Sequence, residues 1–148
     1  MIQRQIASPL GPLTLTETDG ALTALVWGTG PSDDSPLLRD AESQIAAYFS
    51  GHRQEFDLPM GVMGSDFQKA VCKAMLDIPH GQTRSYGDLA KALSAPAQAI
   101  GQACGANPIP ILIPCHRITG TQGLGGFSGG SGPETKIWLL RHEGALLI

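Results

Sequence analysis

Three adjacent residues offer the clearest chemistry in the chain: Cys115, His116 and Arg117 follow the apolar run PIPILIP. A thiol reacts as its thiolate, and an ordinary cysteine, with a pKa of about 8.5, is mostly protonated at neutral pH. A nucleophilic cysteine therefore needs a base or a cation beside it. The sequence predicts a reactive thiol at Cys115 with an imidazole base.

His116 is the base nearest to this thiol in the sequence. Neighbouring side chains in an extended segment point to opposite sides, so we expect a water molecule to link the two groups. A nucleophile and its base usually require a third residue that fixes the imidazole tautomer. Glu143 is our choice for that acceptor, and the sequence also leaves Asp77 and Asp88 open.

The remaining cysteines have a structural interpretation. Cys72 and Cys104 fall on the apolar faces of expected helices, where a cysteine behaves as a small buried apolar residue. Arg117 is most simply an ion-pair partner. The cysteines and histidines lack the spacing of zinc ligands, so we expect neither a metal nor another cofactor.

Several elements must position Cys115. Ile111 to Ile113 are expected to form a short buried strand that stops at Pro114. Residues 120–132 contain seven glycines, which indicates either a surface loop or a backbone that approaches a ligand closely. A last helix is expected from Pro133 to Gly144.

Upstream, two short helices form a helix-turn-helix candidate. One begins at Ser85, with Asp88 completing a capping box, and the other follows the break at residues 94–96 and runs to Gly105. A further helix begins after Ser65. Packed helices in any small α domain would give the same pattern.

The N-terminal part of the chain has a β pattern. Residues 2–7, 13–17 and 22–27 predict a three-stranded antiparallel meander, and residues 36–49 have the spacing of a helix that packs on it. Residues 61–64 form a plausible linker. We therefore predict two domains, residues 1–62 and 63–148, in a chain of the α+β class.

Composition limits the classes of function. The chain is 42% hydrophobic and 16% charged, which argues against disorder throughout. The net charge is -3, but residues 65–148 hold seven Lys/Arg against five Asp/Glu, so a polyanion should meet this part. The unpaired cysteines and the lack of a signal peptide indicate a cytoplasmic protein. No apolar run approaches the ~20 residues that span a membrane.

At this point the residues resemble a known family, the O6-alkylguanine-DNA alkyltransferases, also called methylated-DNA-protein-cysteine methyltransferases. The matching motifs are NPIPILIPCHR at 107–117, GFSGG at 126–130 and WLLRHEG at 138–144. Looser matches are SYGDLA at 85–90 and SPLGPL at 8–13. The resemblance spans nearly the whole chain and is strongest in its C-terminal part.

The resemblance implies an N-terminal ribonuclease-H-like antiparallel sheet with a helix, and a C-terminal winged helix-turn-helix domain. Such a domain binds the minor groove and flips the damaged guanine out of the stack. The expected partner is double-stranded DNA containing O6-alkylguanine, with O4-alkylthymine as a further candidate substrate, and the protein is expected to act as a monomer. Cys115 would accept the alkyl group in one displacement and keep it, so each molecule would act once.

The resemblance also implies roles for single positions. His116 would act on Cys115 through water, Glu143 would complete the network, and Tyr86 would protonate or hydrogen-bond the leaving guanine. The carbonyl groups of Cys115 and Ile118 would accept from the guanine amino group. The substrate-binding positions would be Asn107, Ile118, Phe127 and Ser128, and the DNA-binding positions Ser85, Tyr86, Ala97, Gln98 and Gly101.

One position departs from the family pattern. Gln98 stands where the family usually has an arginine that inserts into the stack left by the guanine. Glutamine can hydrogen-bond the orphaned cytosine but lacks the charge and the stacking plane of a guanidinium group. We therefore predict a weaker lesion search, with the chemistry at Cys115 intact.

Three other functions remain open from the sequence. The chain could be a sensor that binds alkylated DNA without repairing it, although such relatives typically lack the motif cysteine. It could be a thiol hydrolase or acyltransferase with a Cys-His-Glu triad. It could also be a helix-turn-helix regulator, which the acidic balance disfavours.

Overall fold

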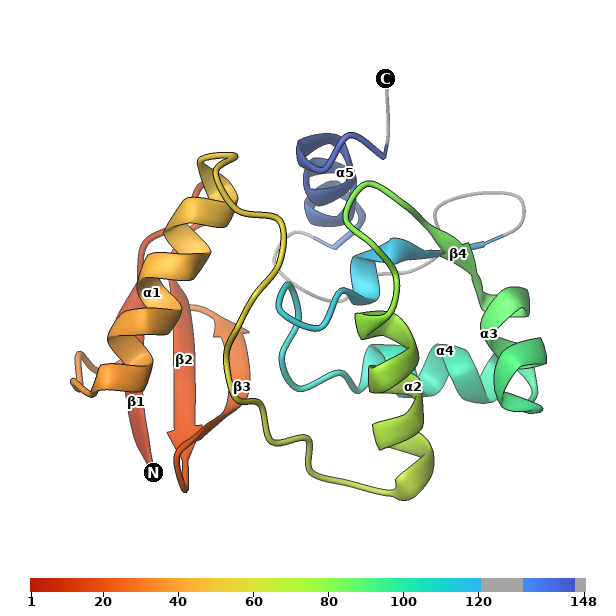
Figure 1. Ribbon diagram of the computed structural model, residues 1–148, viewed down its shortest axis with the longest axis horizontal. Helices are drawn as coiled ribbons and strands as arrows, with labels where there is room; N and C mark the ends of the chain where they lie inside the picture. The colour runs from red at the N-terminus through yellow and green to blue at the C-terminus, as the bar shows by residue number, and fades with distance from the viewer. Residues whose placement is uncertain (121–131, 146–148) are drawn as a thin grey trace. The chain divides into compact units, whose positions relative to one another are not determined.

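The computed structural model describes residues 1–120 and 132–145, and the chain divides into two compact units, Met1–Val62 and Met63–Ile148 (Figure 1). The first unit contains a sheet with a helix, and the second is mainly helical. This mixed architecture confirms the α+β class. Within the described residues, no helix is long and apolar enough to cross a membrane.

The first unit is built on a three-stranded antiparallel sheet. Its strands are β1 (Ile2–Ile6), β2 (Leu13–Thr18) and β3 (Ala21–Trp27), in the order β1-β2-β3. The turn between β2 and β3 consists of Asp19 and Gly20, which both have positive φ angles, as a tight hairpin turn requires. The predicted meander is therefore confirmed.

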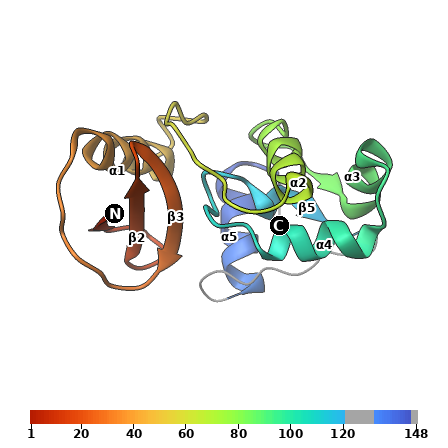
Figure 2. The same cartoon turned by 90° about the horizontal axis from the view of Figure 1, so that it is seen from below.

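Helix α1 (Pro36–Phe49) covers one face of this sheet (Figures 1 and 2). The Ser35 side chain caps the helix by accepting from the Leu38 amide at 2.9 Å. Apolar side chains from the sheet and the helix form a common core, which includes Leu13, Leu15, Leu22, Leu25, Leu38, Ala41, Ile45 and Tyr48. The helix predicted for residues 36–49 is thus confirmed together with its packing.

The second unit contains the predicted run of short helices: α2 (Asp66–Leu76), α3 (Tyr86–Leu93) and α4 (Ala97–Gly105) pack on one another (Figure 2). Ser65 caps α2, and Ser85 and Asp88 form the predicted capping box at the start of α3. Ser94 turns the chain between α3 and α4 with a φ of 52°. The predicted helix-turn-helix pair is present.

A short parallel pairing, which the sequence did not predict, joins distant parts of the second unit. Strand β4 (Arg84–Ser85) pairs with β5 (Ile118–Thr119), with Ser85 opposite Thr119. Because β4 leads directly into α3, the pairing holds the start of α3 against the segment that follows Cys115.

The strand predicted for Ile111 to Ile113 is wrong. Ile111 and Leu112 lie in a turn, with Ile111 at a φ of 73°, and Cys115–Arg117 form a short 3-10 helix, η1. All three apolar side chains are nevertheless buried. Pro110 and Pro114 flank the run and supply no amide hydrogen, so burial here comes with a compact turn instead of a sheet ladder.

Helix α5 (Pro133–His142) is the last helix of the described chain. Its buried residues Thr135, Lys136, Leu139 and Leu140 form one stripe, and Glu143 follows the stripe as the C-cap. The sequence placed the cap one residue later, at Gly144, which has the positive φ of 79° that commonly follows a helix end. The stripe therefore carries Glu143 into the interior.

Candidate active site

A buried group of charged side chains follows Cys115. The imidazole Nε2 of His116 lies 2.7 Å from Glu143 Oε2. Arg117 donates to the same carboxylate twice, from Nε to Oε1 at 2.8 Å and from Nη2 to Oε2 at 3.1 Å, and donates from Nη1 to the Ile78 carbonyl. The side chains of His116 and Glu143 are fully buried.

The structure assigns the acceptor that the sequence left open. Asp88 accepts from the Ser85 amide in the capping box of α3, and Asp77 is the exposed C-cap residue of α2. Glu143 alone of the three contacts His116. Arg117, expected to be an ion-pair partner, pairs with Glu143 as well.

Charge states in this group follow from burial and hydrogen bonding. Burial alone would raise the pKa of the Glu143 carboxyl, but the hydrogen bonds from His116 and Arg117 outweigh it and hold this pKa well below its ordinary value of 4.5. Burial lowers the pKa of His116 below 6.5, although the hydrogen bond to Glu143 opposes this shift. At neutral pH, Glu143 is therefore ionised and His116 is uncharged.

This pairing fixes the tautomer of His116. An ionised carboxylate can only accept, so Nε2 carries the imidazole hydrogen and Nδ1 has a free lone pair. Nδ1 is buried and has no hydrogen-bond partner among the described protein atoms. His116 is therefore held from one side and is ready to accept a proton at the other.

Cys115 is a free cysteine of intermediate exposure. Burial raises the pKa of this thiol, and the Asn107 side chain and Lys136 lower it by smaller amounts. The thiol therefore rests in its protonated form, and its reaction requires a base.

Asn107 connects the end of α4 to the turn before Cys115. Its amide nitrogen donates to the Ile113 carbonyl at 2.8 Å, and its side-chain oxygen accepts from the Ile109 amide at 3.0 Å. The backbone amide of Asn107 in turn donates to the carbonyl of Cys104 in α4. Asn107 thus fixes the path of the strained turn that contains Ile111.

Four of the five predicted DNA-binding residues lie at the starts of α3 and α4, and Gly101 lies in the middle of α4. Ser85 is the N-cap of α3 and Tyr86 its first residue, while Ala97 and Gln98 are exposed in the first turn of α4. A methyl group built on Gly101 of α4 would lie 4.0 Å from the Tyr86 ring, so the two helices bring these positions together.

The other predicted binding residues are only partly covered by the structure. Ile118 is buried and is the first residue of β5, directly after η1. Phe127 and Ser128 lie outside the described residues. Within the part of the chain that the structure describes, no group of three or more His, Cys, Asp or Glu is arranged to hold a metal ion.

Sequence reasoning missed Lys136, which is fully buried and donates from Nζ to the Ile118 carbonyl at 2.5 Å. A signal was present, because Lys136 precedes the apolar Leu140 by four residues and Glu143 by seven, the spacing of one helix face. A lysine on the buried face of a helix is unusual enough to mark a site.

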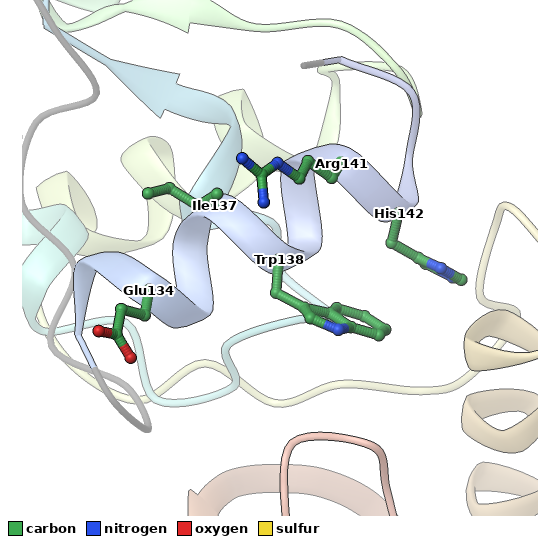
Figure 3. A pocket seen from close by; sticks show the side chains of 5 residues that line it. All are labelled: Glu134, Ile137, Trp138, Arg141 and His142. Atoms are coloured by element: carbon green, nitrogen blue, oxygen red, sulfur yellow. The ribbon is translucent and has the colours of Figure 1, made fainter. Parts of the chain in front are cut away.

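A hollow of about 540 Å³ lies along a different face of α5 (Figure 3). It is lined by Glu134, Ile137, Trp138, Arg141 and His142, with the Trp138 ring stacked on the His142 ring at 4.9 Å. None of its lining residues was predicted as a site residue. Its lining does not include His116, Arg117 or Glu143, so the hollow is distinct from the buried group around His116.

Comparison with known proteins adds independent information. Residues 66–145 match the family model described as 6-O-methylguanine DNA methyltransferase, DNA binding domain, and residues 1–61 match the ribonuclease-like domain of the same protein. A curated Mycobacterium tuberculosis methylated-DNA-protein-cysteine methyltransferase is 44% identical over 138 residues, 86% of this chain and 84% of that protein. The Methanosarcina barkeri protein of the same name is 40% identical, with 93% and 94% covered.

Solved structures agree. The crystal structure of Mycobacterium tuberculosis OGT in complex with DNA has a TM-score of 0.87 at 44% identity and covers 97% of this chain and 92% of that one. An O6-methylguanine DNA methyltransferase from Methanococcus jannaschii has a TM-score of 0.70 at 25% identity, with 97% and 95% covered. Both similarities extend over both units of the chain.

Proposed function

The chain belongs to the 6-O-methylguanine DNA methyltransferase family, and on this basis we propose that it repairs DNA by moving an alkyl group from O6-alkylguanine to its own Cys115. The reaction is stoichiometric, because the thioether that forms is not hydrolysed. The observation that carries the proposal is the geometry of His116. Its Nε2 is hydrogen-bonded to Glu143, and its buried Nδ1 has no hydrogen-bond partner among the described protein atoms.

The first step is activation of the thiol. His116 Nδ1 accepts the Cys115 proton through a bridging water, and Glu143 stabilises the imidazolium that results. Arg117 keeps Glu143 ionised and fixed in place by its two hydrogen bonds.

The second step is a single displacement. The Cys115 sulfur forms a bond to the alkyl carbon while the bond from that carbon to guanine O6 breaks, and its electron pair passes to the guanine. The Tyr86 hydroxyl donates a proton to the guanine, because departure as a neutral base is easier than departure as an anion. Tyr86 then regains a proton from solvent, and His116 loses its extra proton.

The guanine is held by backbone and apolar groups. The carbonyl groups of Cys115 and Ile118 accept from its amino group. The family resemblance assigns O6 to the Ser128 backbone and an apolar wall to Phe127, and both residues lie outside the described part of the chain. Asn107 supports this site by holding the turn before Cys115. These contacts select guanine by its hydrogen-bonding pattern.

The second unit provides the DNA-binding surface. We propose that residues 63–148 form the winged helix-turn-helix alkyltransferase domain and residues 1–62 the ribonuclease-H-like domain, a division supported by the two compact units and the two family models. Contacts to double-stranded DNA come from Ser85 and Tyr86 at the start of α3 and from Ala97, Gln98 and Gly101 of α4, of which Ala97 and Gln98 are exposed. The three free cysteines support a cytoplasmic location.

Intact mass spectrometry tests the proposal directly. The protein is incubated with duplex DNA containing O6-methylguanine, and the expected result is the mass of one added methyl group, located on the peptide that contains Cys115. Cys115→Ala should stay unmodified, and Cys72→Ala should be modified like the native protein. Tight lesion binding without a mass change would favour the lesion sensor, and repeated turnover without a lasting thioether would favour a hydrolase.

A further inference from the structure

Lys136 is a fully buried lysine beside the reactive turn. Moving an ammonium group out of water carries a large desolvation cost, so lysines are almost never fully buried unless they are paired. None of the steps derived above for alkyl transfer uses Lys136.

The Lys136 head group is aimed at the backbone that follows Cys115. Nζ donates to the carbonyl oxygen of Ile118, the residue at which η1 passes into β5. The other end of Lys136 is fixed in the first turn of α5, where its amide donates to the Gly132 carbonyl. Lys136 thus ties α5 to the end of the turn that carries the thiol.

The same lysine interacts electrostatically with the Cys115 thiol. Burial is the largest influence on both groups, raising the pKa of Cys115 and lowering the pKa of Lys136. The interaction between the two groups opposes both shifts, because an ammonium ion favours a neighbouring thiolate.

The neighbouring charged groups are less suited to this task. Arg117 forms a bidentate ion pair with Glu143, so the charges of these two side chains offset each other. Burial keeps His116 uncharged until it accepts a proton. A positive charge close to Cys115 before proton transfer is therefore best supplied by Lys136.

We propose that Lys136 is a positioning residue of alkyl transfer, which fixes the Ile118 carbonyl for the guanine amino group and favours the Cys115 thiolate by its charge. A carbonyl oxygen has two lone pairs, so the Ile118 carbonyl can accept from Lys136 and from guanine together. The inference rests on the proposed function for its guanine contact, whereas its effect on the thiol does not require DNA.

Three substitutions separate the two effects. Lys136→Arg retains a charge and a donor, Lys136→Gln retains a donor without the charge, and Lys136→Met removes both while keeping an unbranched side chain. Lys73→Met is the matched control, because Lys73 is exposed in α2 of the same unit.

The first measurement is the reaction of Cys115 with iodoacetamide as a function of pH, followed on the Cys115 peptide by mass spectrometry. For Lys136→Gln and Lys136→Met the midpoint should move upward by about one pH unit, whereas Lys136→Arg and Lys73→Met should resemble the native protein. A lysine that only supports the fold would not move this midpoint. If Lys136→Met fails to fold, Lys136→Gln carries the test.

The second measurement is the single-turnover rate of methyl transfer from duplex DNA. It should fall in the order native, Lys136→Arg, Lys136→Gln, Lys136→Met. Folded Gln and Met variants with native pH profiles overturn the role of the charge, and native transfer rates overturn the positioning role. A native protein that takes no methyl group would instead refute the proposed function, while the iodoacetamide profiles would still test the effect of Lys136 on Cys115.

Discussion

The carboxylate of Glu143 accepts three hydrogen bonds from two side chains, and both of its oxygens are occupied. Two oxygens that only accept hydrogen bonds are needed here, and a carboxylate provides them. An amide has only one accepting oxygen and would present a donor either to Arg117 or to His116. At the residue scale, the chemistry proposed for Cys115 therefore depends on a group 28 positions away in the sequence.

Glu143→Gln tests this dependence. An amide that donates to His116 Nε2 places the imidazole hydrogen on Nδ1, which can then no longer accept the thiol proton. The single-turnover transfer rate should fall by about 100-fold or more, with DNA affinity largely retained. Arg117 loses part of its buried pairing, so the free energy of unfolding should fall by about 3 kcal/mol.

Glu134→Gln is the matched control, since Glu134 is exposed in the first turn of the same helix. It should leave both the transfer rate and the stability unchanged. A native transfer rate in folded Glu143→Gln would remove Glu143 from the network.

Stability against acid follows from the same residues. The pKa values of His116 and Glu143 both lie lower in the folded protein, so the unfolded chain binds more protons as the pH falls. Each contribution is fully present above the ordinary value and is lost below it. By calorimetry, Tm should begin to fall below pH 6.5 and fall more steeply below pH 4.5.

His116→Asn checks the first part of this profile. The decline that begins near pH 6.5 should become smaller in this variant, and the steeper decline below pH 4.5 should remain. Part of the first decline persists because burial also lowers the pKa of His80 from 6.5. A native protein whose Tm stays constant down to pH 4.5 would contradict the assignment of a neutral buried His116.

At the scale of elements, the site depends on turns as much as on helices. Ile111, a β-branched residue, has a positive φ, a conformation that costs of order 1–3 kcal/mol and persists only where surrounding contacts enforce it. Asn107 and the burial of Ile111 supply such contacts here. The strained turn thus accompanies the reactive cysteine, as strained backbone often does at functional sites.

The turn between α2 and β4 offers a test of how elements position Glu143. Gly81 has a φ of 85°, and a methyl group there would lie 3.2 Å from the Glu143 carbonyl oxygen. Gly81→Ala should cost about 1 kcal/mol of stability from its backbone conformation and should also slow transfer by shifting Glu143. Single-turnover kinetics and chemical denaturation measure the two effects.

Gly51→Ala is the control for the stability cost of placing alanine at a positive φ angle. Gly51 has a similar φ of 83° but nothing within 4 Å of the added methyl group. It should lose similar stability and transfer at the native rate. Equal transfer rates in the two variants would show that the Gly81 turn does not position Glu143.

Helix α4, which carries three of the proposed DNA-binding residues, supports a separate prediction. Helix α4 contains no charged residue, and Gln98 lies exposed in its first turn. Gln98→Arg should speed repair of duplex DNA at fixed salt, because a guanidinium plane can stack where the guanine leaves. Gln102→Arg adds the same charge at an exposed position one turn later and should not give this gain. Equal rates in both variants and the native protein would argue against the prediction.

At the scale of the whole molecule, net charge and its distribution limit DNA binding. The chain has a net charge of -3, and of the seven Lys/Arg in residues 65–148, Arg117 and Lys136 are buried within the site. Five exposed cations remain to meet phosphate groups: Lys69, Lys73, Arg84, Lys91 and Arg141. Each neutralised phosphate contributes about 0.9 to the slope of log binding constant against log salt concentration. Five cations therefore limit the magnitude of this slope to about 4.5.

Fluorescence anisotropy with labelled duplex DNA across a salt series measures this slope. Binding that loses affinity more steeply would show that further cations, from residues 1–64, contact the DNA. A slope near zero would contradict phosphate binding by the second unit.

Local signals in the sequence were sufficient to predict most of the helices and the strands of the N-terminal sheet, and to identify the candidate nucleophile. The adjacency of Cys115 and His116 indicated the chemistry, and the caps at Ser65 and Ser85 located α2 and α3, because each signal involves residues within four positions. The tertiary structure alone decided which carboxylate holds His116, which carbonyl group Lys136 contacts, how β4 pairs with β5, and that a strained turn replaces the expected strand. These features depend on contacts between residues far apart in the chain, where local pattern carries no information and packing decides.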